Sequence, residues 1–404
     1  MSDRLLPGGG ICSRRPGGAA RAHALHRGVH RQEVIRLNRA DAFRVAPADP
    51  WPAAGSGSKP YASPPDRVVR TPPDGELVTV LGRACGLRDP VAHPLPPGRS
   101  DRVWLLAERD GGRRPAPGRG IVLKLAPSAA EVAALEGLAG HAEALRLPAP
   151  LAVVGAGGTA TVLDGLGRAA GEAEASPRAG RRGEPAALAM TLRPGRSLDL
   201  SLHAGAAIPL RALARCMAEL HAASPPGGLP VELAPGEWLA ERLPGWWRDG
   251  PRWGAADLGA VLPVAFNRLQ VLAAGAPPPE AVLTHGDWAP RHVLVERGAV
   301  TGLVDWAGTR VADPARDVAS AVTGLFAEGL SARAALALGA DLAALYAAES
   351  GRALGAFAFR LLAAVTERTI GALRDRGSGR DSGTAAAWGG LLALGLEQAG
   401  RPRP

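Results

Sequence analysis

Lysine is almost absent from this sequence of 404 residues, which contains two lysines and 45 arginines. Both side chains serve as solvated surface charges, so a lysine inside an apolar run indicates a position that needs a compact ammonium on a flexible stem. Lys124 lies in such a run, "RGIVLKLAP". The alternative is a surface lysine whose stem covers the edge of a strand.

Cysteine is scarce as well, and long hydrophobic runs are missing. The three cysteines are far apart and form no CxxC pair, which argues against a disulfide framework and a cysteine zinc site: Cys12, Cys85 and Cys216. A reducing, cytoplasmic location is expected. The first residues lack the apolar core of a signal peptide, and charged residues interrupt the Ala/Leu-rich segments before about 18 residues. We therefore expect no membrane partner.

The net charge of +9 is concentrated at the N-terminus. Residues 1 to 70 hold twelve Arg or Lys and five Asp or Glu, which leaves a charge of only +2 for the other 334 residues. This Gly-, Pro- and Arg-rich segment, bounded at residues 1–72, is predicted to be a disordered tail. Aromatic residues are not interleaved with its basic residues, so no specific nucleic-acid partner is expected.

Hydrophobic periodicity predicts an α+β protein with two lobes: a β-rich N-lobe at 73–192 and a mainly helical C-lobe at 193–400. In the N-lobe, the segment that begins "ELVTVL" is a short helix or strand, residues 102–107 and the lysine run form a hairpin, and 165–185 is an irregular excursion. Helices are predicted at 129–143, 208–222, 257–274, 314–328, 332–349, 352–375 and 384–398.

One glycine-rich segment imitates a dinucleotide fingerprint. Gly155-Ala-Gly-Gly-Thr-Ala160 fits G-x-G-x-x-A and follows an apolar run. That fingerprint requires a helix beginning at the glycines within a parallel βαβ unit. The continuation "TATVL" is short and β-branched, so the pattern favours a hairpin turn.

A short β-rich island at 281–306 carries the most informative residues. Two apolar strands are separated by a Gly-containing turn; His285 and Asp287 precede the first strand, and Asp305 ends the second. A hairpin that presents two carboxylates and a histidine at one edge suits a divalent cation on a polyanionic substrate. The alternative is a pair of loop-capping aspartates with a core histidine.

His285-Gly-Asp287, followed by His292 and then Asp305, resembles the catalytic and metal-binding loops of the aminoglycoside and macrolide phosphotransferase family, whose fold is protein-kinase-like. Further segments resemble that family in the same order over about 76–400. They are the phosphate-covering turn "PPGRSDRVW", the lysine strand "IVLKL", the helix start "EVAALEGLAG", the hinge "LRPG" and the first C-lobe helix "MAELH".

The resemblance implies an ATP- or GTP-dependent kinase that transfers a phosphoryl group to a hydroxyl of a small molecule, such as an aminoglycoside or macrolide antibiotic. It assigns acceptor deprotonation to Asp287, Mg²⁺ binding to His292 and Asp305, and the α- and β-phosphates to Lys124. Further nucleotide contacts are assigned to Gly98, Ser100, Met190, Leu192 and Glu131, the last as the partner of Lys124, with Glu136 as its alternative.

Two departures from the family pattern keep other functions open. His292 stands where the metal-binding loop usually has Asn, and the spacing of seven residues from Lys124 to Glu131 is short. These departures leave open a pseudokinase that binds nucleotide as a regulator. A metabolic kinase for choline, homoserine or a sugar-like alcohol is also an alternative, because it differs only in the acceptor, which the sequence does not decide.

Several polar and aromatic residues have more ordinary interpretations. Asp313 is predicted to cap a helix and Asp317 to brace a loop. His285 is expected to fix its loop through backbone hydrogen bonds, and His221 to be a packed residue at a helix end. The tryptophans of "EWLAERLPGWWRDGPRW" are interpreted either as a wall of the acceptor site or as lobe packing: Trp238, Trp246, Trp247 and Trp253.

Overall fold

The computed structural model describes residues 72–95, 102–109, 120–155, 159–164, 167–174, 185–199, 208–249, 261–377 and 383–400. The predicted tail at 1–72 lies outside these ranges except for its last residue. Of the predicted site residues, Gly98 and Ser100 also lie outside them.

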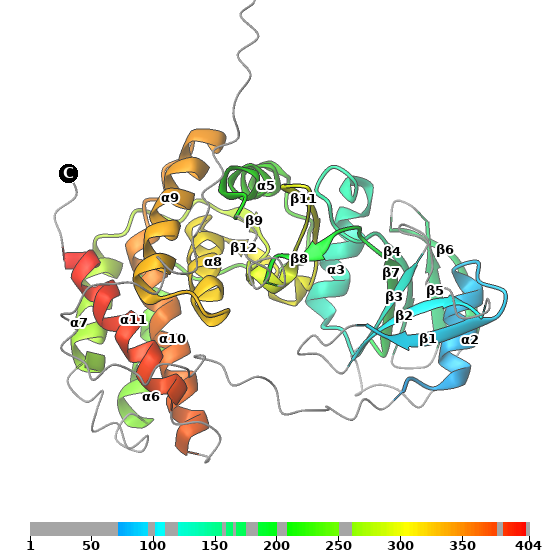
Figure 1. Cartoon of the computed structure of the whole chain (residues 1–404), viewed down its shortest axis with the longest axis horizontal. Helices are drawn as coiled ribbons and strands as arrows, with labels where there is room; N and C mark the ends of the chain where they lie inside the picture. Colours follow the sequence, from blue (N-terminus) through cyan, green and yellow to red (C-terminus); the bar gives the residue numbers. More distant parts are fainter. Residues whose placement is uncertain are drawn as a thin grey trace, which may run out of the picture. The chain divides into compact units, whose positions relative to one another are not determined.

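A seven-stranded antiparallel sheet dominates the N-terminal half of the described chain (Figure 1). Its strands are, in spatial order, β1 (Pro90–Pro94), β2 (Val103–Glu108), β3 (Ile121–Leu125), β7 (Ala187–Thr191), β4 (Pro150–Val154), β5 (Thr159–Leu163) and β6 (Ala169–Glu174). The predicted hairpin around the lysine run is confirmed, because β2 pairs with β3 and sets Val103 opposite Lys124.

The glycine-rich segment forms a hairpin and not a nucleotide-binding turn. Strand β4 ends at Val154, β5 begins at Thr159, and the two strands pair antiparallel. Because the two consecutive strands on either side of these glycines pair antiparallel, they do not form a parallel βαβ unit, and the interpretation as a hairpin is confirmed.

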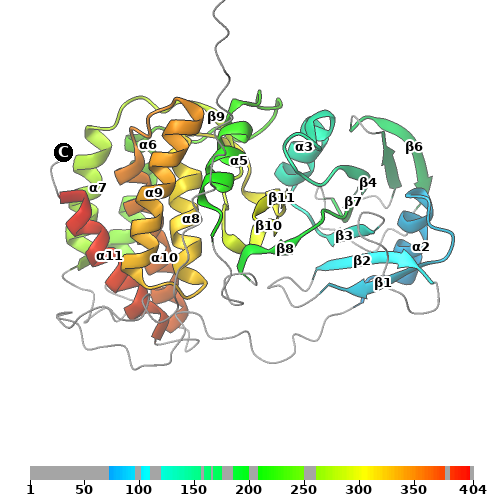
Figure 2. The same cartoon turned by 45° about the horizontal axis from the view of Figure 1, so that its top comes forward.

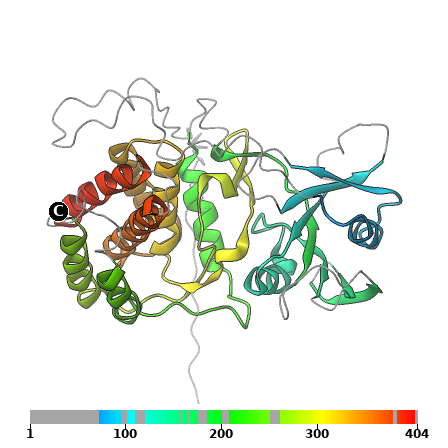
Figure 3. The same ribbon diagram turned by 90° about the horizontal axis from the view of Figure 1, so that it is seen from below.

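Two helices accompany the sheet. Helix α2 (Gly75–Ala84) begins where the Asp74 carboxylate accepts the backbone N–H of Glu76 at 2.8 Å, and it buries Leu77, Val78 and Leu81. Figure 3, where α2 is blue, shows it beside the strands that it contacts. The segment predicted as helix or strand is therefore a helix. Helix α3 (Ala129–Leu138) ends five residues before the predicted limit and continues as a 3₁₀ turn, η1 (Ala139–His141).

The C-terminal half is mainly helical, as predicted. Its helices are α5 (Leu210–Ala222), α6 (Pro235–Asp249), α7 (Val261–Ala274), α8 (Ala315–Ala327), α9 (Ala332–Ser350), α10 (Phe357–Gly377) and α11 (Gly383–Gly400). Helix α8 contacts α9 and α10, and α10 contacts α11, so these four pack as neighbours (Figure 2). None of the described helices combines the length and hydropathy needed to cross a bilayer.

The predicted β-rich island forms two small sheets. One contains β8 (Arg196–Ser197), β10 (Val293–Glu296) and β11 (Ala299–Leu303), and the other contains β9 (Val282–Thr284) and β12 (Arg310–Ala312). Two 3₁₀ turns, η3 (Pro290–His292) and η4 (Trp306–Gly308), flank the β10–β11 hairpin. These turns place the polar residues of the predicted catalytic and metal-binding loops at one end of the hairpin.

One segment differs from prediction, and the Trp-rich segment carried no prediction of its secondary structure. Residues 169–174, placed in a charged Gly/Ala-rich excursion between strands, form the edge strand β6. The segment "AAGEAE" has weak β-propensity, and its strand conformation depends on hydrogen bonding to β5. The Trp-rich segment forms helix α6, in spite of Pro244 within it. Trp246 stacks on Phe266 of α7, and Trp238 makes an edge contact with Phe359 of α10. Packing thus explains these two rings, and Trp253 lies outside the described residues.

Candidate active site

Lys124 joins two carboxylates from distant parts of the chain. Its Nζ lies 2.8 Å from Oε1 of Glu131, in the first turn of α3, and 2.8 Å from Oδ1 of Asp305, 181 residues later. Ser128 starts α3 by accepting the backbone N–H of Glu131, which fixes the position of that residue. The structure therefore brings Glu131, and not the alternative Glu136, to the lysine.

The electrostatics of this cluster keep the lysine charged. Burial opposes the charged ammonium of Lys124, but Glu131 and Asp305 outweigh it and raise the lysine pKa above its ordinary value. Its side chain is 15% exposed and that of Glu131 is 1% exposed, whereas Asp305 is 40% exposed. The cation is thus anchored on a buried carboxylate and faces a partly open one.

Asp305 adopts an unusual backbone conformation directly after β11. Its φ of 64° and ψ of 71° lie in the left-handed region, which non-glycine residues rarely occupy and which costs on the order of 1 kcal/mol or more. Burial would raise the pKa of its carboxyl, but Lys124 and His292 lower it to about 2. Asp305 is therefore an anion held in a strained position.

The loop after β9 brings Asp287 and His292 to the same place. Oδ2 of Asp287 lies 3.2 Å from Nη2 of Arg291, and its side chain is 30% exposed. Nδ1 of His292 lies 3.0 Å from the carbonyl oxygen of Asp287, and Nε2 lies 3.3 Å from Oδ2 of Asp305. Burial and the nearby Arg291 lower the pKa of His292 to about 4, so its imidazole is neutral at pH 7.

The residues predicted to bind Mg²⁺ fit a shared site. A neutral imidazole that donates from Nδ1 to the carbonyl of Asp287 leaves the lone pair of Nε2 directed at Asp305. Mg²⁺ characteristically takes one or two carboxylates and completes its shell with substrate phosphates and waters. Asp305 supplies such a carboxylate, and no cluster of three or more acidic, His or Cys ligands occurs among the described residues. Asp305 with His292 is therefore a pair of adjacent metal-ligating groups, of which the carboxylate oxygen is the type of ligand that Mg²⁺ prefers.

A buried polar network fixes the loop that carries Asp287. Both oxygens of Asp317 accept backbone N–H groups, from His285 at 2.9 Å and from Gly286 at 2.8 Å. Nε2 of His285 lies 3.1 Å from the carbonyl of Val304, which ties this loop to the strand before Asp305. The predictions that Asp317 braces a loop and that His285 fixes it through backbone bonds are confirmed.

His221 and Asp313 have structural roles, as predicted. His221 is buried at the end of α5, where its Nε2 lies 3.1 Å from Asp317 and its Nδ1 lies 2.9 Å from the hydroxyl of Tyr346. Asp313 accepts the backbone N–H of Ala315 at the start of α8. The part played by Tyr346 carries no signal in the sequence, because this residue lies inside the Ala/Leu-rich pattern of α9.

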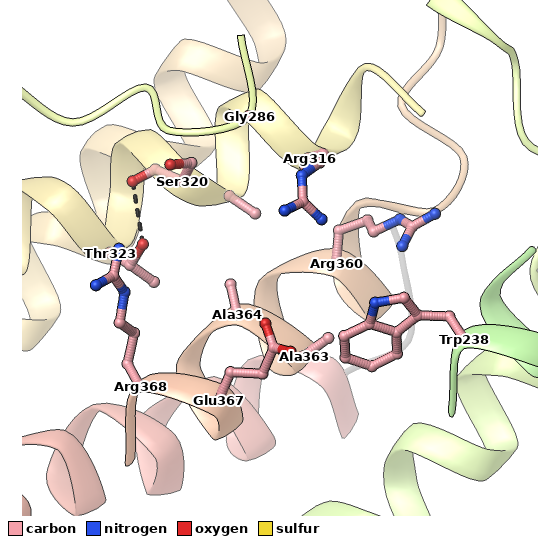
Figure 4. A pocket seen from close by; sticks show the side chains of 11 residues that line it. Trp238, Gly286, Arg316, Ser320, Thr323, Arg360, Ala363, Ala364, Glu367 and Arg368 are labelled. Carbon is pink, nitrogen blue, oxygen red and sulfur yellow. Dashed lines mark hydrogen bonds between the residues drawn. The ribbon is translucent and has the colours of Figure 1, made fainter. Parts of the chain in front are cut away.

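A pocket adjoins the loop that carries Asp287 (Figure 4). Its lining includes the backbone at Gly286, Trp238 from α6, and charged side chains from α8 and α10: Arg316, Arg360, Glu367 and Arg368. Nη2 of Arg368 lies 3.7 Å from Oδ1 of Asp287, so the pocket reaches the predicted catalytic carboxylate. Sequence reasoning missed these arginines. It interpreted Trp238 as a residue of either the acceptor site or the packing, and in the structure this ring packs against Phe359 and also lines the pocket.

The predicted adenine-side residues lie at the end of β7, the strand next to the lysine strand. Met190 in β7 is buried and pairs with Val122 of β3, and the backbone N–H of Leu192 donates to the carbonyl of Gly120 at 3.0 Å. Both residues therefore lie beside the strand of Lys124, where the backbone after β7 leads toward the C-terminal half.

Comparison with known proteins gives three findings. Residues 91–354 match the model of the phosphotransferase enzyme family. A 36-residue segment, 9% of this chain and 12% of the other protein, is 56% identical to the uncharacterized protein YcbJ of Bacillus subtilis strain 168, so this chain matches only a small part of that curated relative.

Solved structures that are similar include two phosphotransferases. A thermostable mutant of aminoglycoside phosphotransferase APH(4)-Ia is 17% identical, with a TM-score of 0.49 over 78% of this chain and 95% of that one. Macrolide 2'-phosphotransferase MphH from Brachybacterium faecium is 20% identical, with a TM-score of 0.43 over 80% and 98%. Because the family model covers well over half of the chain, this protein belongs to the phosphotransferase enzyme family, as its motifs predict.

Proposed function

We propose that this protein transfers the γ-phosphoryl group of ATP or GTP to a hydroxyl group of a small molecule. The observation that carries the proposal is the contact of Lys124 with both Glu131 and Asp305. A nucleotide triphosphate needs a cation for its phosphates and a carboxylate for its metal, and this cluster supplies both at adjacent positions.

Each residue has a role in this proposal. Lys124 binds the α- and β-phosphates, and Glu131 holds the ammonium in place. Asp305 and His292 hold Mg²⁺, which supplies positive charge for the phosphate oxygens when it is bound. Met190 and Leu192 lie beside the base, while Gly98 and Ser100 are assigned to the turn over the phosphates.

Asp287 orients the acceptor hydroxyl and accepts its proton. The hydroxyl oxygen forms a bond to the γ-phosphorus as the bond from that phosphorus to the β,γ-bridging oxygen breaks, which yields the phosphorylated acceptor and a nucleoside diphosphate. Asp287 is suited to this role because its carboxylate is partly exposed and lies 3.7 Å from Arg368, a residue that lines the pocket. Asp317 keeps it there by fixing the backbone of the two preceding residues.

A cytoplasmic location suits this chemistry. Nucleoside triphosphates are abundant in the cytoplasm, and both cysteines in the described ranges, Cys85 and Cys216, are unpaired thiols. Neither the nucleotide site nor the pocket requires a nucleic-acid or membrane partner.

The test is phosphoryl transfer to a pool of acceptors, followed by mass spectrometry. The pool contains hygromycin B and other aminoglycosides, macrolides, choline, homoserine, hydroxy acids and sugars, each incubated with Mg²⁺-ATP or Mg²⁺-GTP. The Asp287→Ala protein is the blank. A compound that gains one phosphoryl group only with the wild-type protein supports the proposal. Nucleotide binding without transfer to any compound favours the regulator, and no nucleotide binding overturns the proposal.

A further inference from the structure

The pocket beside Asp287 is built around arginine. Three of its lining side chains are guanidinium groups, Arg316, Arg360 and Arg368, against one carboxylate, Glu367. That carboxylate is already engaged, because Oε1 of Glu367 accepts from Nε of Arg242 at 2.9 Å. Figure 4 shows the guanidinium of Arg316 extending from α8 toward the space that Arg360, Glu367 and Trp238 border.

The two innermost arginines share one buried carboxylate. Arg316 contacts Oε1 of Glu232, and Nη2 of Arg360 lies 3.0 Å from Oε2 of the same residue. The side chains of Glu232 and Arg360 are 2% and 4% exposed, so solvent screens this pair little, whereas the side chain of Arg316 is 23% exposed. Asp313 also interacts with Arg360, but one of its oxygens caps α8.

Both guanidinium groups retain donors that no described residue accepts. Nε of Arg316 and Nε of Arg360 are buried and have no hydrogen-bond partner in the described part of the chain. A buried, charged donor without an acceptor is destabilising, so such groups are normally satisfied. Burial also lowers the pKa of Arg360, and Arg316 and Arg242 lower it further against the opposing effect of Glu232. The pocket therefore favours an added anion.

The size and shape of the pocket restrict which molecules can carry the anionic group into it. The pocket has a volume of about 100 Å³, whereas sites for drug-sized ligands have about 300 to 1,000 Å³. Trp238 forms one wall, and Arg242 lies over its ring at 4.3 Å. A compact molecule, or the compact end of one, fits this space, and a polycationic aminoglycoside would meet arginines at every charged wall except Glu367.

We propose that the acceptor of the phosphoryl group carries a carboxylate or phosphate group, which pairs with Arg316, Arg360 and Arg368 while its hydroxyl faces Asp287. This inference rests on the proposed function, because it treats the pocket as the acceptor side of that reaction. Arg368 and Asp287 lie only 3.7 Å apart. The anionic group of the acceptor and its reacting hydroxyl are therefore separated by only a few bonds.

Binding is tested first, by calorimetric titration of the full chain saturated with ADP and Mg²⁺, so that added anions do not compete at Lys124. The probes are glycerate, glycerol 3-phosphate, uncharged glycerol and hygromycin B. We expect at least tenfold tighter binding of glycerate or glycerol 3-phosphate than of glycerol, and no binding of hygromycin B. The stronger of the first two identifies the anion as a carboxylate or a phosphate.

Two variants on the same helix assign the binding to this pocket. Arg368→Gln, a half-exposed position in the lining, should weaken anion binding about tenfold, and Arg374→Gln, an exposed position on α10 outside the lining, should leave it unchanged. Any of three outcomes would overturn the inference. The first is equal affinity for glycerol and the two anions, and the second is binding of hygromycin B alone. The third is that anion binding is lost in both variants or in neither.

Phosphoryl transfer then separates this inference from the proposed function. If the protein phosphorylates an uncharged or cationic alcohol with higher kcat/KM than the hydroxy acid and the phosphorylated alcohol, the function stands and the inference is wrong. If anions bind as described but the protein neither binds nor consumes ATP or GTP, the proposed function fails while the anion site stands.

Discussion

Asp317 accepts hydrogen bonds from the backbone N–H groups of His285 and Gly286, at 2.9 and 2.8 Å, and so connects helix α8 to the loop that carries the proposed catalytic carboxylate. Its side chain is fully buried, and His221 lies 3.1 Å away. Burial opposes the ionised form, but His221, His285 and the N–H of Gly286 lower the carboxyl pKa below its ordinary value. Asp317 therefore fixes the backbone next to Asp287, although it is not among the residues that line the pocket.

Asp317→Ala is expected to lower the free energy of unfolding by about 3 kcal/mol, because it leaves buried donors without an acceptor. Asp317→Asn, which retains one carbonyl oxygen, should lose less. Urea denaturation measures both, and Asp341→Ala, at an exposed position of α9, is the control and should stay within about 0.5 kcal/mol. A change in Asp317→Ala no larger than that of the control would show that the network does not stabilise the loop.

Gly286 provides a second test of loop geometry. Its φ is 80°, and a Cβ there would lie 1.9 Å from the carbonyl oxygen of Gly308. Gly286→Ala should therefore displace the loop and reduce kcat/KM by more than about 100-fold. Gly371→Ala is the control: Gly371 lies within α10, and a Cβ there would meet no atom within 4 Å. This substitution should stabilise the protein by about 0.5 to 1 kcal/mol. Unchanged turnover in Gly286→Ala would contradict the tight packing of the two loops.

Residues of the candidate site were predictable from the sequence where a charged side chain stands in or next to an apolar strand. Lys124 interrupts an apolar strand and Asp305 follows one, and such residues are conspicuous because burying a charge beside a strand needs a partner. Asp287 lies in the loop between two apolar strands. Glu131 was preferred to Glu136 because its spacing to Leu135 and Leu138 resembles that of the corresponding family helix. The surrounding motifs resemble those of one family and follow the same order along the chain, and this resemblance assigned a role to each residue.

The pocket was not predictable for a physical reason. Arg316 and Arg360 belong to helices whose sequences read as ordinary amphipathic patterns, and in a chain with 45 arginines one more carries little information. Their burial depends on Glu232, which lies 84 residues before Arg316. Strand β6 was missed likewise, because its partner strand, and not its own composition, determines its conformation.

The two acidic residues of the proposed site should fail in different ways. Asp305→Ala removes a metal ligand and a partner of Lys124, so Mg²⁺-nucleotide affinity should fall at least tenfold and turnover should fall with it. Asp287→Asn removes the proton acceptor and its negative charge but no group assigned to nucleotide or metal, so affinity should change less than about twofold while kcat falls about 10² to 10⁴-fold. Fluorescent-nucleotide titration and initial rates measure the two effects. Equal nucleotide affinity and equal activity in both variants and the wild type would refute these roles.

His292 makes the stability of the metal-free protein depend on pH. Burial and Arg291 lower its pKa from 6.5 to about 4 in the folded chain, so between these values the unfolded chain binds more protons than the folded one. The free energy of unfolding should therefore fall as the pH drops from 6.5 toward 4, by up to about 3 kcal/mol, since each pKa unit corresponds to about 1.4 kcal/mol.

The pH range distinguishes the effect of His292 from that of Asp305. Because the pKa of Asp305 is lowered to about 2, protonation of this residue reduces the free energy of unfolding only as the pH falls from about 4 toward 2. Urea denaturation of wild type and His292→Asn at intervals from pH 8 to pH 4.5, without nucleotide or metal, measures the difference. His292→Asn should show a shallower slope below pH 6.5, whereas His93→Asn, at an exposed position of β1, should match the wild type. Parallel slopes for wild type and His292→Asn would mean that His292 is protonated in the folded chain. Nε2 would then carry a proton toward Asp305 instead of a lone pair, and the assignment of His292 as a metal ligand would fail with it.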